Sequence, residues 1–518
     1  MKKVGNPPPF AGSRRWASLA FLCLAVVVIV MDGSIVNVAL PTLAVRLAGA
    51  TTSGLQWIVD AYILAFAALL LTMGNAADRF GRRRVLLLGL FVFAAFSVGA
   101  ALSDGCGELI AWRTCMGFGA AMIFPSTLAI ITEEFPEPEL RKTAIAIWAG
   151  SSGLGVAIGP VAGGWLLEHL PWGAIFLVNL PIVLVATAGV MLFVRESRDP
   201  HRPSFDAVGC ALAILAILSL VWGLIEAPER GWTTWSTLAS LSGAVVLLAG
   251  FVAWERSRAE PMLDVRYFLD RRFSGSCVAI AAAFFGLFGF VFMVTQFFQF
   301  LHRYSALSAG IRTLPFAGFI LLGAMGAAWA GRRTSSRVII SVGLVLMSAG
   351  FAWATGESLR TPYSVMVLQM GLLGIGLGLV NAAATEVVMT TLPLRKAGTG
   401  SSINDTLREV GGTLGVAGMG SAFNALYRGR MADVLDAAPL PETAKTQVMA
   451  SIGAANEVID RIEAIAGVHA ANSLRGPVQE AFLRGFHASC WIASGAALLG
   501  AAAVLVAIPR ITANSAEK

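Results

Sequence analysis

Three ionisable side chains, Asp32, Asp60 and Arg113, lie inside long apolar segments of this sequence. Charge is costly in hydrocarbon, so an ionisable residue there usually serves a function or has a structural partner. At about 1.5 Å per helical residue, Asp32 lies about 24 Å along its segment, and Asp60 and Arg113 lie about 7 to 9 Å into theirs from the opposite side. We therefore expect the three at similar depth, where two carboxylates and a guanidinium could neutralise one another or transfer a proton.

The residue types favour different interpretations at these positions. For Asp32 and Arg113 we favour proton coupling over a structural ion pair, whereas for Asp60 the two interpretations are equally compatible with the sequence. A fourth acid, Glu386, lies late in another apolar segment, near its predicted cytoplasmic end. It could be a second protonatable site, a contact for a cation or an interfacial residue, and the sequence leaves these alternatives open.

The segments that carry these residues are long enough to cross a membrane. The chain has 518 residues, of which 56% are hydrophobic and 13% charged, whereas a soluble globular protein carries about 25% charged residues. A membrane-spanning helix needs about 20 apolar residues, and this criterion predicts an all-α membrane protein with fourteen spans. They cover residues 16–40, 55–73, 85–101, 109–131, 143–167, 174–194, 207–225, 235–254, 274–298, 307–330, 338–354, 363–387, 403–427 and 488–508.

Basic residues indicate how the chain is oriented. The formal net charge is +7, but the basic residues gather in short clusters between apolar segments, which favours membrane orientation over nucleic-acid binding. Most of them fall on one side if the two termini and the loops after even-numbered spans lie together. Because Lys and Arg accumulate on the cytoplasmic side, we predict that both termini are cytoplasmic and that the protein spans the bacterial cytoplasmic (inner) membrane.

The sequence offers no catalytic or metal-binding constellation. The six cysteines show no C-x-x-C spacing, the five histidines are scattered, and neither H-E-x-x-H nor G-x-S-x-G occurs. A G-x-x-x-x-G-K-[ST] phosphate loop is also missing, which argues against an ATP-driven pump. We therefore expect no enzyme activity, no cofactor and no metal.

A charged turn between the second and third spans carries an ordered pattern, GNAADRFGRRR at residues 74–84. Its charges must sit at a membrane face, and its glycines allow two helices to reverse direction in a few residues. The pattern resembles the cytoplasmic loop signature of the major facilitator superfamily. The resemblance implies a conformational role for six residues, namely Gly74, Asp78, Arg79, Gly81, Arg82 and Arg83.

Further segments resemble the fourteen-helix drug/proton antiporter branch of that superfamily, the EmrB/QacA-like exporters. Residues 31–41, MDGSIVNVALP, resemble its first-helix signature, and residues 113–121, RTCMGFGAA, resemble its fourth-helix motif, in which the arginine is tied to proton transfer. Met116 stands where that motif usually has glutamine. Residues 384–412 look like the matching part of the second half. The fifth span resembles the antiporter motif found in exporters, through Gly155, Gly159, Pro160, Gly163 and Gly164.

The resemblance implies a major facilitator fold with two six-helix bundles and two extra spans between them. Residues 1–194 would form the first bundle, 195–272 the linker with the additional spans, and 273–518 the second bundle. The segment Gly331-Arg332-Arg333 repeats the G-R-R of the charged turn at residues 74–84, which agrees with two related halves. The implied activity is proton-coupled export of lipophilic, often cationic, drugs and antibiotics. A transporter for one metabolite or natural product, or a nutrient importer, is the alternative.

Substrate contacts are predicted more weakly. Aromatic rings attract organic cations and methionine adapts to varied shapes, and the ninth span is rich in phenylalanine. Because its phenylalanines point all round the helix, fewer than half of them can face a substrate. The residues that we select as a possible cavity lining are Asn37, Trp148, Phe288, Met293 and Gln296.

One extracytoplasmic connection, 428–484, is too long for a simple turn. Apolar residues recur in it at helical spacing between acidic and basic ones, which predicts amphipathic helices lying on the outer surface. A passive cover is favoured over a substrate gate. The small-molecule substrate, protons and the lipid bilayer are the expected partners, and the sequence does not tell whether a periplasmic adaptor joins them.

Overall fold

The computed structural model describes residues 10–198, 206–258, 261, 263–391, 397–436 and 440–508. Helices account for nearly all of these residues, and the only β-type pairing among them is an isolated bridge between Ala48 and Gly105. Two sets of residues lie outside the described ranges. They are Pro393, within the 384–412 segment, and part of the basic residues on the predicted cytoplasmic side, namely Lys2, Lys3, Arg202, Arg395, Lys396, Arg510 and Lys518.

Seven helices form what we call the N-terminal group: α1 (Phe10–Arg46), α2 (Thr52–Phe80), α3 (Arg82–Ala101), α4 (Cys106–Glu134), α5 (Pro138–His169), α6 (Ala174–Leu177) and α7 (Asn179–Phe193). The last two follow one another through Val178, whose φ and ψ of −60° and −23° are helical, so together they occupy the predicted sixth span. Two accessory helices follow, α8 (Ala207–Arg230) and α9 (Trp235–Ser257), which pack on each other.

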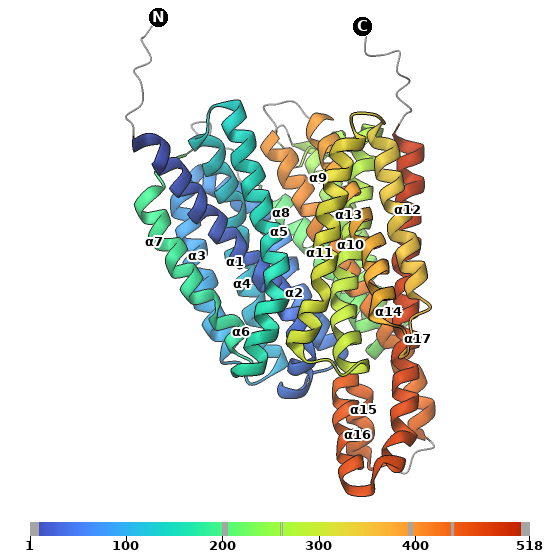
Figure 1. Cartoon of the computed structure of the whole chain (residues 1–518). Coiled ribbons are helices and arrows are strands. Elements are labelled where there is room, and N and C mark those ends of the chain that lie inside the picture. The colour runs from blue at the N-terminus through green and yellow to red at the C-terminus, as the bar shows by residue number, and fades with distance from the viewer. Residues whose placement is uncertain are drawn as a thin grey trace, which may run out of the picture.

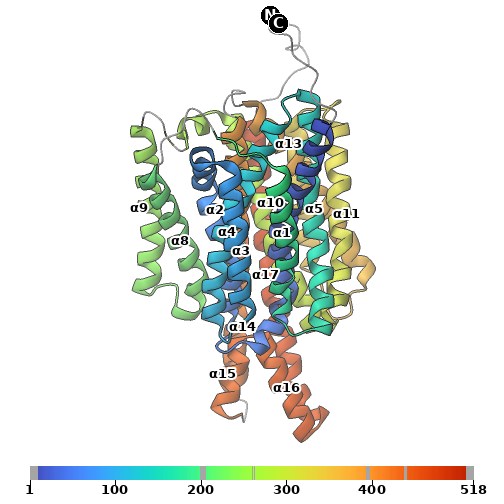
Figure 2. The ribbon, with the colours of Figure 1, turned by 90° about the vertical axis from the view of Figure 1, so that its left-hand side faces the viewer.

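The C-terminal group consists of η1 (Val265–Leu269), α10 (Arg271–Gln296), the π-helical turn η2 (Phe297–Leu301), α11 (Ala306–Ala330), α12 (Ser336–Ala354), α13 (Tyr363–Thr391), α14 (Ala397–Asp436) and α17 (Val468–Ala507). Two shorter helices, α15 (Glu442–Ala450) and α16 (Ile452–Ala466), lie between α14 and α17. Figures 1 and 2 show the long helices side by side with their axes roughly aligned. The division of the chain at 194 and 272 stays a proposal.

Thirteen helices in the described part of the chain are long and apolar enough to cross a membrane. The predicted span 403–427 lies within α14, which has 40 residues but is not among the thirteen. Its first turns carry Asn404, Asp405, Arg408 and Glu409, and it packs against α10, α17, α2 and α8. Such polar residues lower its hydropathy, so a count of fourteen spans stays a prediction.

The two ends of the helix array differ. α1 begins and α17 ends at one end, called here the terminal end, whereas α15, α16 and the start of α17 project beyond the other, the extension end (Figure 1). At about 1.5 Å per residue, a helix of 40 residues such as α17 is about 60 Å long, twice the hydrocarbon thickness. The cytoplasmic position of the termini stays a prediction.

The extension corrects one expectation. Helices in the predicted connection are present, but they do not lie flat on the outer surface, because α15 and α16 project away from the bundle beside the start of α17 (Figure 2). Their apolar residues Val448, Ile452 and Ile459 are at most 3% exposed, and α16 packs on α17. The amphipathic face is therefore satisfied by protein contacts, and only single residues such as Ile465 stay exposed.

Glycines allow the long helices to approach closely. A β-carbon on Gly117 of α4 would lie 2.4 Å from the Tyr62 carbonyl oxygen of α2, and one on Gly119 would lie 2.8 Å from the Phe93 nitrogen of α3. No side chain can occupy that space without moving backbone, so these two glycines fix how α4 sits between α2 and α3. This packing determines where Arg113, one turn earlier on α4, is placed.

Candidate functional site

Asp32 of α1 and Arg113 of α4 form an ion pair inside the N-terminal group. The Arg113 Nη1 atom donates to Asp32 Oδ2, and the two side chains are 1% and 0% exposed. Two charges taken out of water need near-complete hydrogen bonding to offset their desolvation. The equal depth expected from the sequence therefore corresponds to direct contact for these two residues.

Neighbouring groups satisfy the remaining atoms of the pair. Asn179, the first residue of α7, donates from Nδ2 to Asp32 Oδ1 at 2.8 Å and to Ser97 Oγ at 3.3 Å. Arg113 Nε donates to the Ile58 carbonyl of α2 at 3.2 Å, and its guanidinium lies 4.2 Å from the centre of the Tyr62 ring. The pair is thus held by groups from α2, α3 and α7 as well as by its own helices.

Asp60 of α2 is buried differently. Its side chain is 0% exposed, and neither carboxylate oxygen has a hydrogen-bond partner among the described residues. The structural ion pair that we considered for Asp60 is therefore not formed in this conformation. A charged carboxylate with no partner is among the most costly groups to bury, whereas a protonated one costs much less.

Three acidic residues of the C-terminal group lie on α13 and α14. Glu386, near the end of α13, has an exposed side chain, in contrast to Asp32 and Asp60. Arg408 pairs with Asp405 at 3.4 Å, donates to Asn381 Oδ1 at 2.7 Å and lies 5.3 Å from the centre of the Phe284 ring. Glu409, the next residue, lies on the same helix, which packs against α2 of the N-terminal group.

The charged turn between α2 and α3 makes a compact network at the terminal end. Arg82 donates from Nε to Asp78 at 2.8 Å and from Nη1 to Glu133 of α4 at 2.6 Å. Gly81 has φ of 116°, a backbone conformation that disfavours residues other than glycine. Arg83, two residues later, donates from Nη2 to the Met191 carbonyl at 2.7 Å. The Arg79 guanidinium lies over the ring of Phe80, the next residue. A β-carbon on Gly74 would contact the Pro125 side chain.

The glycines of the predicted antiporter motif serve two different contacts. Gly155 and Gly159 face α1, where a β-carbon on them would lie 3.0 Å from the Val27 carbonyl and 2.9 Å from the Met31 carbonyl. Gly163 also faces α1, at Ile35. Gly164 faces the other group instead, because its β-carbon would lie 2.4 Å from the Leu307 α-carbon of α11. Pro160 joins this second contact, since its carbonyl oxygen would lie 2.2 Å from a β-carbon on Gly310.

The five residues proposed as a cavity lining lie on three helices. Asn37 of α1 donates to the Gly33 carbonyl at 3.1 Å, and Gln296 of α10 donates to the Phe292 carbonyl at 3.0 Å. Trp148 of α5 donates to Thr127 at 3.0 Å. Phe288 packs where a side chain on Gly412 would clash, and Met293 is 1% exposed. Their role in binding stays a prediction.

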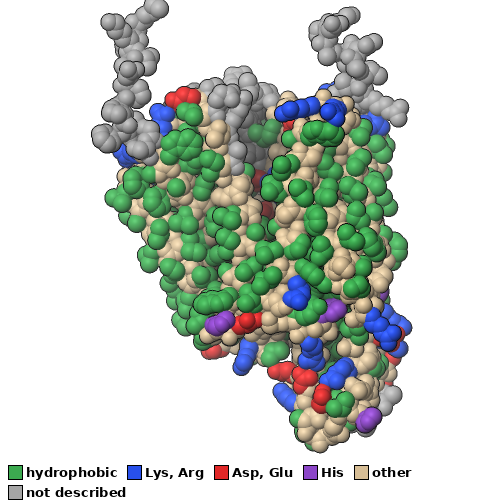
Figure 3. Space-filling model, in the orientation of Figure 1, with side chains coloured by type: hydrophobic (Ala, Val, Ile, Leu, Met, Phe, Trp, Pro, Cys, Tyr) green, Lys and Arg blue, Asp and Glu red, His purple; other side chains and the backbone are tan. Residues whose placement is uncertain are grey.

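The two helix groups meet at the extension end. Gln56 of α2 donates to the Val416 carbonyl of α14 at 3.2 Å, and Gln299 of η2 donates to the Val38 carbonyl of α1 at 2.9 Å. In Figure 3 the face of the molecule is hollowed between the two groups toward the terminal end, and acidic side chains line the hollow. This conformation is therefore closed at the extension end.

The sequence model of the Major Facilitator Superfamily matches residues 22–416. The chain belongs to the major facilitator superfamily. Its relatives include the multidrug efflux pump LfrA of Mycolicibacterium smegmatis, 35% identical over 96% of this chain and 97% of that protein. The tetracenomycin C resistance and export protein of Streptomyces glaucescens is 31% identical, covering 95% and 91%. The methyl viologen resistance protein SmvA of Salmonella typhimurium is 33% identical, covering 78% and 81%.

Solved structures agree on the fold. A bacterial homologue of the human lysosomal transporter Spinster, in an inward-facing and unoccupied conformation, superposes with a TM-score of 0.65 at 18% identity, covering 98% of this chain and all of that one. The resemblance found in the sequence is confirmed. This major facilitator protein is a transporter of small molecules rather than an enzyme, and a multi-pass integral protein of a bacterial membrane.

Sequence reasoning missed several residues of this major facilitator site. Asn179 and Tyr62 contact the Asp32–Arg113 pair. Asn179 had one available signal, since it is a strongly polar residue within the apolar sixth span. Glu409 is an acid next to Arg408 on α14, a helix that packs against α2, and the sequence prediction did not select it.

Proposed function

We propose that this protein is a proton-coupled antiporter that exports small lipophilic compounds, cationic drugs among them, across the bacterial cytoplasmic membrane by alternating access. The observation that carries the proposal is the buried Asp32–Arg113 pair with the unpartnered Asp60 carboxyl close by along α2. Relatives named for multidrug efflux, for tetracenomycin C export and for methyl viologen resistance support the export of foreign compounds.

Asp32 supplies the coupling in this proposal. Protonation of its carboxylate would neutralise one partner of the buried pair and leave the Arg113 charge without a counterion, which is strongly unfavourable in an apolar interior. The cation would then be stabilised only by a rearrangement of α1 against α4. A proton bound at Asp32 therefore changes which conformation is more stable, as coupling requires.

Asp60 and Glu409 are the further proton-binding candidates. Asp60 has no partner in this conformation, so binding a proton there removes an uncompensated charge. Glu409 lies on α14, which packs against α2, the helix that carries Asp60. Glu386, with its exposed side chain, fits a contact at the membrane surface better than a buried proton site.

With both termini in the cytoplasm, as the distribution of basic residues predicts, the conformation described here would be open inward and closed outward. Substrate would enter from the cytoplasm into the hollow of Figure 3. Rocking of the two groups would then open the extension end. Each proton that returns inward gains about 2.3 kcal/mol per 100 mV of membrane potential, in addition to the pH gradient.

The test is transport by the purified protein in liposomes under an imposed pH gradient. A panel of lipophilic cationic dyes and antibiotics is added, with and without an ionophore that collapses the gradient. We expect gradient-dependent movement of several compounds, and its loss in Asp32→Asn while the variant is still inserted in the membrane. Full gradient-driven transport by Asp32→Asn would remove this residue from the coupling mechanism.

A dedicated exporter of one natural product is the second candidate. It is favoured by relatives named for tetracenomycin C export and as a probable actinorhodin transporter, 31% identical to this chain in both cases. The same panel separates the two, because a dedicated exporter moves one scaffold and rejects dyes of other shapes. Net inward movement of substrate down the same gradient would instead indicate an importer.

A further inference from the structure

The accessory helix α8 contacts both helix groups at the extension end. It packs against α2 of the N-terminal group and against α14 of the C-terminal group. An apolar cluster joins all three helices and includes Val221 and Ile225 of α8, Ala417 of α14 and Trp57 of α2. Because the first three are fully buried, α8 covers the joint between the two groups on this side.

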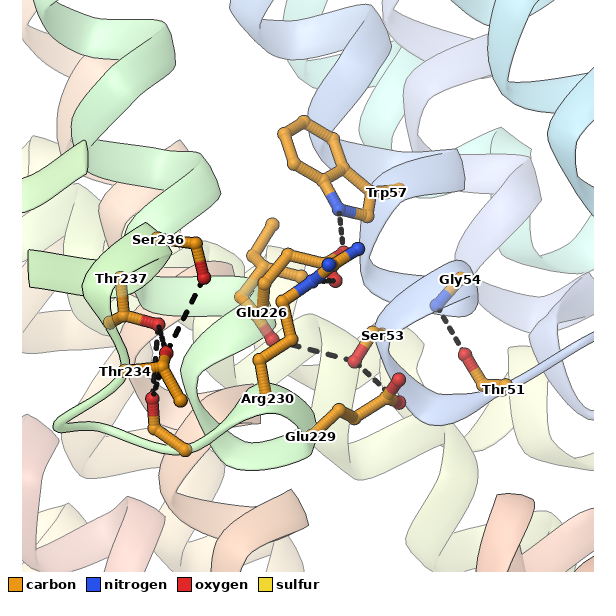
Figure 4. A network of polar contacts seen from close by, with 12 residues as sticks. Thr51, Ser53, Gly54, Trp57, Glu226, Glu229, Arg230, Thr234, Ser236 and Thr237 are labelled. Atoms are coloured by element: carbon orange, nitrogen blue, oxygen red, sulfur yellow. Dashed lines mark hydrogen bonds and ion pairs between the residues drawn. The ribbon is translucent and has the colours of Figure 1, made fainter. Parts of the chain in front are cut away.

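Toward α2, the contact is made by two carboxylates at the end of α8. Figure 4 shows Glu226 and Glu229 reaching Trp57 and Ser53. Ser53 Oγ donates to Glu229 Oε1 at 2.7 Å, and Trp57 Nε1 donates to Glu226 Oε1 at 3.1 Å. Arg230 orients Glu226 from the same helix at 2.9 Å. Hydrogen bonds to ionised acceptors are about twice as strong as neutral ones.

The α2 contact also extends along the length of α8. Near the start of α8, the Thr72 hydroxyl of α2 lies 2.8 Å from Cys210 Sγ. The two helices therefore touch at both ends of α8, and at the extension end through charged acceptors. Complete separation of α8 from α2 would therefore break the contacts at both ends.

Toward α14, the packing is at least as extensive as toward α2, but the contact is mostly apolar. The Ser421 hydroxyl donates to the Leu224 carbonyl of α8, and the remaining contact is the apolar cluster around Ala417. Asn424 of α14 donates directly to Ser53 Oγ of α2 at 3.5 Å. Ser421 and Asn424 are 1% and 0% exposed, so both bonds are sealed from water while this end is closed.

We propose that α8 moves with the N-terminal group and acts as a clamp on the extension-end gate, with Ser421 and Ala417 of α14 as the contact that must release. The proposal rests on the alternating-access function above, because that function requires α2 and α14 to separate at this end. The hydrogen bonds from α8 to α2 are more numerous and lie at both ends of α8, so the mostly apolar contact with α14 is the one that opens. The two extra helices are thus part of the gate rather than a passive spacer between the groups.

Two engineered bridges test this assignment in the same protein. The first joins α8 to α14 through Leu224→Cys with Ser421→Cys, and the second joins α8 to α2 away from the gate, through Thr72→Cys with the native Cys210. Each pair is closed by oxidation or by a short bifunctional thiol reagent, after Cys115, the least buried native cysteine among the six, has been replaced by serine. We expect the α8–α14 bridge to reduce transport at least about tenfold, reversibly on reduction, and the α2–α8 bridge to leave it within about twofold.

A second measurement follows the opening of the extension end directly, without a transport assay. A cysteine placed by Ala417→Cys is labelled with a membrane-impermeant maleimide from the extension side. We expect Ser421→Ala to raise the labelling rate about fivefold, the effect of losing one buried neutral hydrogen bond. The matched control is Ser240→Ala, which removes a similar hydroxyl-to-carbonyl bond, to Ser219, within the accessory pair, and should leave labelling unchanged.

The outcomes separate the two proposals. Unimpaired transport with a complete α8–α14 bridge, or an equal block by the α2–α8 bridge, would overturn the clamp. Equal effects of Ser421→Ala and Ser240→Ala on labelling would overturn it as well. Absence of gradient-driven transport in the unbridged protein would instead count against the antiporter function, whatever the labelling shows.

Discussion

Gly164 of α5 and Leu307 of α11 lie so close that a β-carbon on Gly164 would be 2.4 Å from the Leu307 α-carbon. The two residues belong to different helix groups, and both lie at the extension end. The antiporter-type glycine run therefore does more than pack α5 on α1, since its last member lies in the interface between the groups. Only a residue without a side chain permits this closed conformation.

We predict that Gly164→Ala shifts the protein toward conformations open at the extension end. Overpacking against backbone costs about 1 to 3 kcal/mol, enough to change the ratio of closed to open forms by about tenfold. The change is measured by impermeant maleimide labelling at Ala417→Cys. The control is Gly153→Ala on the same helix, where an added β-carbon meets nothing within 4 Å. Identical labelling of the two variants would contradict the prediction.

Asp32 and Arg113 should be energetically coupled. Removing one member of a buried ion pair leaves the other charge unpaired and costs about 3 to 5 kcal/mol. We expect Asp32→Asn and Arg113→Gln each to lower the unfolding temperature in detergent, and the double variant to be less destabilised than the two effects added together. All three variants should lack gradient-driven transport. Strict additivity would show that the pair contributes no interaction energy in the folded protein.

Asp60→Asn should retain stability and lose coupling. Neither oxygen of Asp60 has a hydrogen-bond partner among the described residues, so the amide breaks no existing bond or ion pair. We expect an unfolding temperature no lower than that of the wild type, and transport that no longer responds to an imposed pH gradient. Asp104→Asn, a matched change at an exposed position, should affect neither. Normal gradient dependence in Asp60→Asn would exclude a proton-carrying role.

Glu357 should make stability depend on pH. It lies in the turn between α12 and α13, is 4% exposed, and its Oε2 atom has no hydrogen-bond partner. Burial raises the pKa of this carboxyl from 4.5 to about 6, against the opposing effect of the Thr361 and Gln369 side chains. The folded state then binds the proton more tightly than the unfolded state, so stability falls as the pH rises from about 4.5 through 6.

Replacing this carboxyl should remove that fall. A pKa shift of this size corresponds to at most about 2 kcal/mol. We expect Glu357→Gln to be more stable than the wild type at pH values above both pKa values, with the difference disappearing in acid. Unfolding temperatures measured across that range check the prediction. Asp433→Asn, at an exposed position on α14, serves as the control, and a pH-independent difference for Glu357→Gln would contradict the assignment.

Much of the site could be predicted because a bilayer restricts where charge can lie. The rise per residue of a helix places Asp32 and Arg113 at one depth, and the structure joins them directly. Depth does not tell which helices are neighbours, however, so the same reasoning grouped Asp60 with the pair although its oxygens have no partner. Asn179 escaped notice for the converse reason, since an amide in an apolar span gives a weaker signal than a charge.

The extension shows a second limit of sequence reasoning. Apolar residues at helical spacing predict that 428–484 is helical, and α15 and α16 are found there. The same pattern cannot tell whether an apolar face meets lipid or protein. Val448 and Ile459 are buried, which is why these helices project beyond the bundle instead of lying on a membrane surface.

By itself the sequence determined the helical membrane architecture, the family and the acids that merit study, because hydropathy, charge placement and ordered motifs are local properties of the chain. Only the tertiary structure decided which of those acids is paired, that Gly164 meets Leu307, and that α8 packs on both α2 and α14. These are contacts between residues far apart in sequence. They depend on how whole helices pack, and the spacing along any one helix does not encode them.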